Sequence, residues 1–178
     1  MKRSRPKILL ATNLDDAMAM YEKYKSNLLG VISDVGFTVH KDEGADKEKM
    51  DAGIDLVKHI RKDDPMMPIP LQSSQESYAA VAEELNVGFL RKYSKTLMIQ
   101  LYEFIKEEFA FGDFIFRNPD RTEFGRAANL KELEMLMRAV PDEVLLGATS
   151  KNMLSKWFMA RGLFTLGSTF KTVLESHF

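Results

Sequence analysis

Three side chains that could act together on an anionic group stand at the ends of short apolar stretches. Asp34, Ser73 and Lys92 each lie at, or just beyond, the end of a run of four to six mostly apolar residues. A carboxylate can act as a nucleophile, while an ammonium and a hydroxyl can stabilise negative charge nearby. If the three runs are parallel strands of one sheet, their carboxyl ends meet at one edge. The sequence therefore predicts one candidate site built from these three residues.

The elements that must position these residues follow an alternating order. Short apolar runs predict four buried strands, at residues 7–12, 29–34, 68–72 and 87–90. Apolar residues at helical spacing predict four helices, at residues 14–27, 54–64, 78–85 and 94–109. Strands that alternate with helices favour a parallel sheet covered by helices. We therefore expect an α/β fold with a parallel sheet of four strands and flanking helices.

The periodicity changes after residue 110, which predicts a second module. Aromatic residues flank the turn-forming cluster Asn118–Arg121, so a β-hairpin is expected there. Asn129 followed by Glu132 resembles a capping box and starts a helix that ends at Pro141. A last helix is expected from Ser150. The predicted division is an α/β domain at residues 1–110 and a small α+β module, a hairpin and two helices, at residues 111–178, which looks like a binding or spacing module.

Composition limits the function classes. The chain has 178 residues, 25 Lys and Arg against 26 Asp and Glu, and no cysteine. A net charge of −1 gives no general attraction to nucleic acid or anionic lipid. The absence of cysteine excludes disulfides, thiolate metal sites and cysteine nucleophiles, and the longest apolar runs are far shorter than a membrane span. We expect a cytoplasmic protein with neither nucleic acid nor membrane as its partner.

The strand-end residues resemble those of the receiver domains of response regulators. The matching motifs are Val31–Asp34, Asp51–Leu56, Leu71–Ser74 and Phe89–Lys92. The resemblance implies an incomplete receiver-like, or flavodoxin-like, sheet in a protein of signal transduction or phosphorelay. It also implies that Asp34 corresponds to the phospho-acceptor, and that Ser73 and Lys92 correspond to the residues that contact the phosphate.

One departure from this family concerns the metal. Receivers hold Mg²⁺ with an acidic pair at the end of their first strand, whereas Asp15 and Asp16 fall inside the predicted first helix. A Mg²⁺ ion would have only Asp34, the carbonyl of Gly36 and water, so we expect weak Mg²⁺ binding or no cofactor. Either one strand–helix unit is missing, or the chain begins at the second unit and its first strand lies upstream. Autonomous phosphorylation is therefore not expected.

A second resemblance covers most of the chain. It is to a regulatory region of bacterial phosphoenolpyruvate/pyruvate-binding proteins related to phosphoenolpyruvate synthase and pyruvate phosphate dikinase. The motifs that carry it are Pro6–Thr12, Asn27–Val35, Leu71–Ser74, Phe111–Arg117, Pro141–Glu143 and Trp157–Arg161. The resemblance implies a segment that is not an enzyme by itself, within a phosphotransferase. Its partners would then be other domains of the same polypeptide or a phosphotransfer protein.

Simpler interpretations of the same residues stay open. Lys92 could pair with Asp34 in an inert site, and Ser73 could cap the next helix. The cluster around His40 has mixed charges and irregular spacing, which favours a solvated loop over a metal site. The opposite alternative is that the chain is an active receiver, which is phosphorylated on Asp34.

The sheet edge raises a question of assembly. If a central strand is missing, the strand that ends at Asp34 has unpaired backbone groups. We expect residues 7–12 to fill that place within the chain, through a right-handed crossover. The alternative is a homodimer in which a second copy supplies the pairing.

Overall fold

The protein folds as two compact units in a computed structural model that describes residues 6–149 and 152–175. One unit consists of residues 7–104, and the other contains the chain from residue 105 onward. Ser150, the predicted start of the last helix, lies outside the described residues. No helix in the described part of the chain is both long and apolar enough to cross a membrane.

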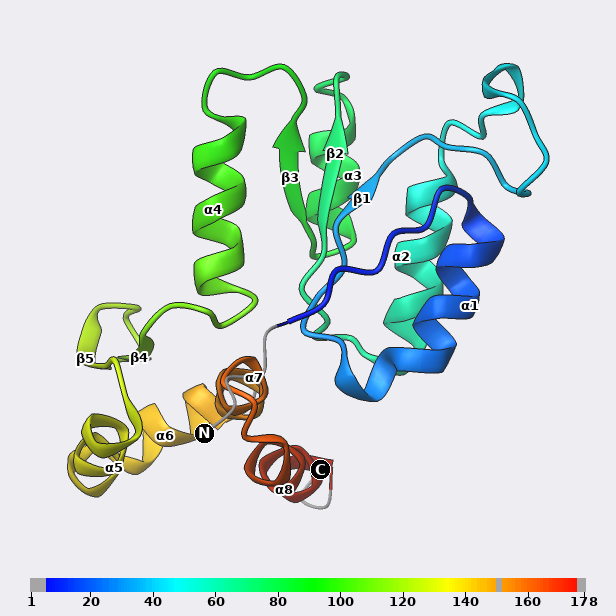
Figure 1. Ribbon diagram of the computed structural model, residues 1–178. Helices are drawn as coiled ribbons and strands as arrows, with labels where there is room; N and C mark the ends of the chain where they lie inside the picture. The colour runs from blue at the N-terminus through cyan, green and yellow to red at the C-terminus, as the bar shows by residue number, and fades with distance from the viewer. Residues whose placement is uncertain (1–5, 150–151, 176–178) are drawn as a thin grey trace. The chain divides into compact units, whose positions relative to one another are not determined.

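The first unit is built around a three-stranded parallel sheet. The strands are β1 (Ser33–Asp34), β2 (Pro70–Ser73) and β3 (Gly88–Arg91), in the spatial order β1-β2-β3. The helices are α1 (Leu14–Tyr24), α2 (Ala52–Asp63), α3 (Tyr78–Glu84) and α4 (Leu97–Glu107), with 3-10 turns at Lys25–Asn27 and Ala45–Lys47. In Figure 1, α1 and α2 lie side by side, and α3 packs behind β2 and β3. The predicted mixed α/β class is confirmed.

The prediction of a fourth strand at residues 7–12 is wrong for the described structure. Ile8 and Leu10 are 96% and 78% exposed, and this segment forms no strand. Its pairing beside residues 29–34 is therefore also absent; the nearest pairing is an isolated parallel bridge from Asn13 to Thr38. The apolar pattern indicates a preference for burial, but a strand also needs a hydrogen-bonded neighbour, which this segment lacks.

Strand β1 is shorter than the predicted run at residues 29–34 because of the strand beside it. Val31 donates its N–H to the carbonyl of Pro68 at 3.1 Å. The register, which pairs Ser33 with Leu71, places Pro70 where an N–H would bond back to the Val31 carbonyl. Proline has no N–H, so the ladder is interrupted before Ser33.

Local polar contacts fix the ends of the helices around this sheet. The Asn13 side chain accepts a hydrogen bond from the N–H of Asp16 at 2.8 Å and so caps α1, as the sequence predicts. Arg61, on α2, donates to the carbonyls of Met67 and Asn86 at 2.8 and 2.9 Å. These two carbonyls precede β2 and β3, so one guanidinium anchors the loops that lead into both strands.

The second unit joins a hairpin to a group of helices. Strands β4 (Phe114–Arg117) and β5 (Glu123–Ala127) are antiparallel, so the predicted hairpin is present. The helices are α5 (Leu130–Ala139), α6 (Asp142–Thr149), α7 (Met153–Ala160) and α8 (Phe164–Glu175). Their buried side chains form one core around Trp157 and Phe116.

The prediction of two helices in this module is wrong, because the described residues contain four. Pro141 ends one helix but also directly precedes α6, where a missing N–H costs nothing. Gly162 adopts a positive φ of 74° between α7 and α8. A left-handed residue of this kind ends a helix and lets the chain turn into the next one.

Candidate functional site

The carboxyl end of the parallel sheet brings Asp34 and Lys92 together. Asp34 is the last residue of β1, and Lys92 directly follows β3. The Lys92 Nζ atom lies 3.0 Å from Asp34 Oδ2, and the two side chains are 31% and 45% exposed. The predicted proximity of these two residues is thus present in the structure. The site therefore holds an ion pair that is partly exposed to solvent.

Ser73 ends β2, the strand between the other two. It is buried, with 8% of its surface exposed, and its hydroxyl accepts a hydrogen bond from the N–H of Gln75 at 3.1 Å. Its carbonyl accepts from the N–H of Lys92 at 2.8 Å. Ser73 therefore turns the chain after β2 and fixes the backbone of Lys92. Ser73 does not cap the next helix, as the sequence allowed, because the residue at the N-cap position of α3 is Ser77.

The acidic residues near the site do not form a cation site of the receiver kind. Asp34 is paired with Lys92, and Asp16 accepts a hydrogen bond from the Asn13 side chain at 2.8 Å. Asp15 instead contacts His40. Among the described residues, no group of three His, Cys, Asp or Glu side chains could hold a metal ion. A Mg²⁺ ion at Asp34 would compete with Lys92 for this carboxylate.

Gly53, whose role was not predicted from the sequence, positions Asp34. The Gly53 N–H donates to the carbonyl of Val35 at 2.8 Å, so the start of α2 lies against the chain just beyond β1. A Cβ atom at this position would overlap the carbonyl oxygen of Asp34. Only glycine allows so close an approach of two backbones. The sequence does contain one signal of this contact, the glycine that follows Asp51 and Ala52. A glycine at the start of a helix often marks a place where another backbone segment approaches closely.

The loop around His40 is organised by hydrogen bonds to acidic residues. Glu43 accepts from the N–H groups of Val39 and His40 at 3.1 and 2.9 Å. His40 Nδ1 lies 2.7 Å from Asp15 Oδ2, and this contact raises the pKa of His40 above its usual value. The exposed pair joins the loop to α1.

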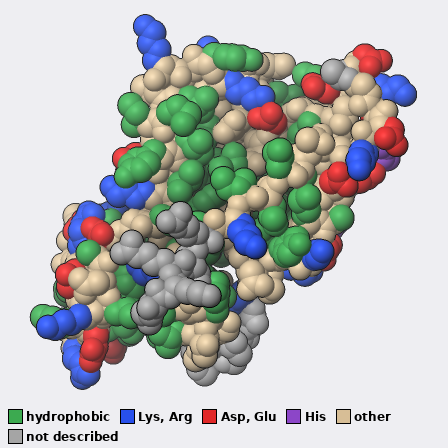
Figure 2. Space-filling view, viewed as in Figure 1, with side chains coloured by type: hydrophobic (Ala, Val, Ile, Leu, Met, Phe, Trp, Pro, Cys, Tyr) green, Lys and Arg blue, Asp and Glu red, His purple; other side chains and the backbone are tan. Residues whose placement is uncertain are grey.

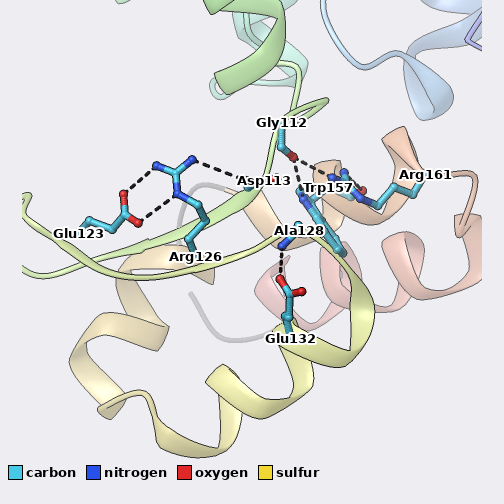
Figure 3. A network of polar contacts seen from close by, with 8 residues as sticks. All are labelled: Gly112, Asp113, Glu123, Arg126, Ala128, Glu132, Trp157 and Arg161. Atoms are coloured by element: carbon cyan, nitrogen blue, oxygen red, sulfur yellow. Dashed lines mark hydrogen bonds and ion pairs between the residues drawn. The ribbon is translucent and has the colours of Figure 1, made fainter.

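A second polar network, in the other unit, is structural. Arg161 donates to the carbonyls of Ala110 and Gly112 at 3.0 and 2.7 Å and stacks on the Trp157 ring at 3.6 Å. Trp157 Nε1 also donates to the Gly112 carbonyl (Figure 3). Burial lowers the pKa of Arg161. The network fixes the chain between α4 and β4 and contains neither a nucleophile nor a general base.

A nearby ion-pair cluster supports the hairpin in the same way. Arg126, on β5, binds both carboxylate oxygens of Glu123 and also reaches Asp113 at 3.4 Å (Figure 3). The Glu132 carboxylate accepts from the N–H of Ala128, next to the start of α5. These contacts pair the charges locally and support the hairpin and the start of α5.

The candidate site therefore consists of Asp34 and Lys92, with Ser73 and Gly53 as positioning residues. Comparisons with protein families, curated proteins and solved structures found no match for this chain. The function has to be inferred from the residues and geometry of the chain itself.

Proposed function

We propose that the chain is a receiver-like regulatory module and that it does not transfer phosphoryl groups by itself. The observation that carries the proposal is the 3.0 Å contact between Lys92 Nζ and Asp34 Oδ2 at the carboxyl end of a parallel sheet. Ligands of open α/β sheets bind at this end. The resemblance to receivers and to phosphoenolpyruvate/pyruvate-binding proteins supports a role within a phosphotransfer protein, with other domains or a partner protein as the target.

The charge at the site favours a regulatory role over an active one. The Lys92 ammonium already neutralises the carboxylate that would have to attack phosphorus. Acidic partners that could hold a Mg²⁺ ion are engaged elsewhere, Asp15 by His40 and Asp16 by Asn13. A phosphoryl donor approaching Asp34 would thus meet one cation, where receivers offer a lysine and a metal ion.

A second candidate function rests on the exposure of the site. With 45% of its side chain exposed, Asp34 is accessible to a small donor such as acetyl phosphate. In that reaction a carboxylate oxygen would form a bond to phosphorus while the bond between phosphorus and the acetate oxygen breaks and acetate leaves. Lys92 would then contact the new phosphoryl group.

Intact-mass measurement separates the two functions. The full chain is incubated with acetyl phosphate and Mg²⁺, beside the Asp34→Asn variant and a control variant, Asp42→Asn, in the exposed loop. We expect no stable phosphoryl adduct on any of the three proteins. An adduct on the parent and on Asp42→Asn that Asp34→Asn lacks would establish the active receiver instead.

A further inference from the structure

Helix α4 packs on the sheet with one of its faces. The ring of Phe104 lies against β3, where a Cβ atom on Gly88 would come within 2.5 Å of it. No residue of α4, all of which the structure describes, is fully buried. The opposite face of the helix carries Met98, Ile99 and Tyr102, which are 71%, 63% and 62% exposed. We call these three residues the α4 face.

The α4 face is one continuous apolar surface. Residues three and four positions apart are neighbours on a helix, so Tyr102 lies next to both Met98 and Ile99. Hydrophobic side chains lie at the surface over α4 in Figure 2. Single exposed apolar residues are ordinary, whereas a contiguous group of large ones indicates an interaction site. A helix face suits another helix as its partner, because the side-chain ridges of one helix fit the grooves of the other.

Charged residues border the α4 face at both of its ends. Lys95, in the turn directly before α4, and Glu103 each lie four positions from Ile99, on opposite sides of it along the chain. Both are exposed. Lys95 has no ion-pair partner among the described residues, and the first turn of α4 contains no acidic residue. The helix dipole disfavours a positive charge at this end, so Lys95 gains nothing from α4 itself.

We propose that two copies of the chain associate through the α4 face, with their α4 helices antiparallel around a twofold axis at Ile99. Such an axis brings each residue opposite the one that lies equally far from Ile99 in the other direction. Lys95 of one copy therefore lies opposite Glu103 of the other, and the contact occurs twice. Parallel helices would instead place like charges opposite each other. The reversal of charge across Ile99 thus favours a second copy as the occupant.

The expected interface is small and lies close to the candidate site. A standard interface buries about 800 Å² on each partner, and one helix face supplies less, so the dimer should be weak and depend on concentration. Exposed ion pairs contribute orientation more than affinity. Because α4 begins shortly after Lys92, the dimer would fix the segment that follows the site. This inference does not depend on whether Asp34 accepts a phosphoryl group.

Sedimentation velocity of the full chain at increasing concentration tests the proposal. We expect a shift from monomer to dimer between low and high micromolar protein. Ile99→Lys places two ammonium groups together at the twofold axis, so this variant should stay monomeric over the same range. The matched control is Met135→Lys on α5, a position that is also 63% exposed, and it should dimerise like the parent. Circular dichroism verifies that both variants fold.

Charge reversal tests the antiparallel arrangement. Lys95→Glu and Glu103→Lys each turn both ion pairs into repulsive contacts, so each should raise the dissociation constant by about tenfold. The double variant restores both ion pairs with the charges exchanged. Its dissociation constant should return to within about threefold of the parent's.

Three results would overturn the proposal. The first is a parent chain that stays monomeric at the highest concentration. The second is equal association of the parent and Ile99→Lys, which would place the contact on another surface. The third is a double charge variant that associates no better than either single variant, which would exclude antiparallel pairing around Ile99.

Discussion

The position of Asp34 depends on three neighbouring residues, each of which acts in a different way. Lys92 contributes charge at 3.0 Å from its carboxylate, and Ser33 contributes a hydroxyl that donates to its carbonyl at 2.8 Å. Gly53 contributes only the absence of a side chain. The position of the carboxylate is therefore sensitive to a single added methyl group on α2.

Gly53→Ala should destabilise the first unit and disturb the site. The new Cβ atom would overlap the Asp34 carbonyl oxygen, and overpacking of this kind typically costs about 1–3 kcal/mol. Gly36→Ala is the matched control: its Cβ would meet backbone atoms at 3.5 Å, an ordinary contact, so its effect should stay within about 0.5 kcal/mol. Urea denaturation measures both variants, and equal free energies of unfolding would contradict the close approach.

His40 provides a prediction about pH. Its hydrogen bond with Asp15 raises its pKa, so an NMR titration should give a value above the usual one of about 6.5. Because the folded pKa is raised, the pair stabilises the fold fully below the pKa of the unfolded histidine. This contribution is lost as the pH rises through the folded pKa. In Asp15→Asn the pKa should return towards 6.5; no change would show that the contact does not persist in solution.

At the scale of secondary-structure elements, the sequence predicted those helices and strands that depend on the local pattern of apolar and turn residues. Periodicity and turn residues correctly indicate the helices around Leu56 and Tyr78, as well as strands β2 and β3. The register of these strands then places Lys92 beside Asp34. Residues 7–12 were mispredicted because pairing depends on a neighbour that the pattern cannot reveal. The extra helices after Pro141 were missed because proline both ends one helix and starts another.

The contacts of the segment before β4 lead to a second stability prediction. Arg161→Lys keeps the charge but loses the fork that binds the carbonyls of Ala110 and Gly112. Hydrogen bonds to a charged group contribute about 1.5–3 kcal/mol, so thermal and urea unfolding of the second unit should shift accordingly.

Arg138→Lys is the control for this change. Arg138 is 77% exposed and contacts only Glu134, one turn away on α5, among the contacts described. Its replacement should change the free energy of unfolding by less than about 0.5 kcal/mol. If the two variants unfold alike, the Arg161 network does not support the second unit.

At the scale of the whole molecule, all residues of the candidate site belong to the first unit. Asp34, Ser73 and Lys92 come from three strand ends, so the sheet is what joins residues far apart in the sequence. The second unit has its own core and its own polar network. The candidate site and the core around Trp157 thus belong to different units.

The most direct test of the central claim follows the amide spectrum of the full chain in beryllofluoride and Mg²⁺. Beryllofluoride mimics a phosphoryl group on an aspartate, and an active receiver would bind it at Asp34. We predict that the ¹H–¹⁵N signals of Asp34, Ser73 and Lys92 stay in place at millimolar reagent, in the parent as in Asp34→Asn. Saturable shifts of these signals in the parent that are absent from Asp34→Asn would contradict it and identify Asp34 as a working acceptor.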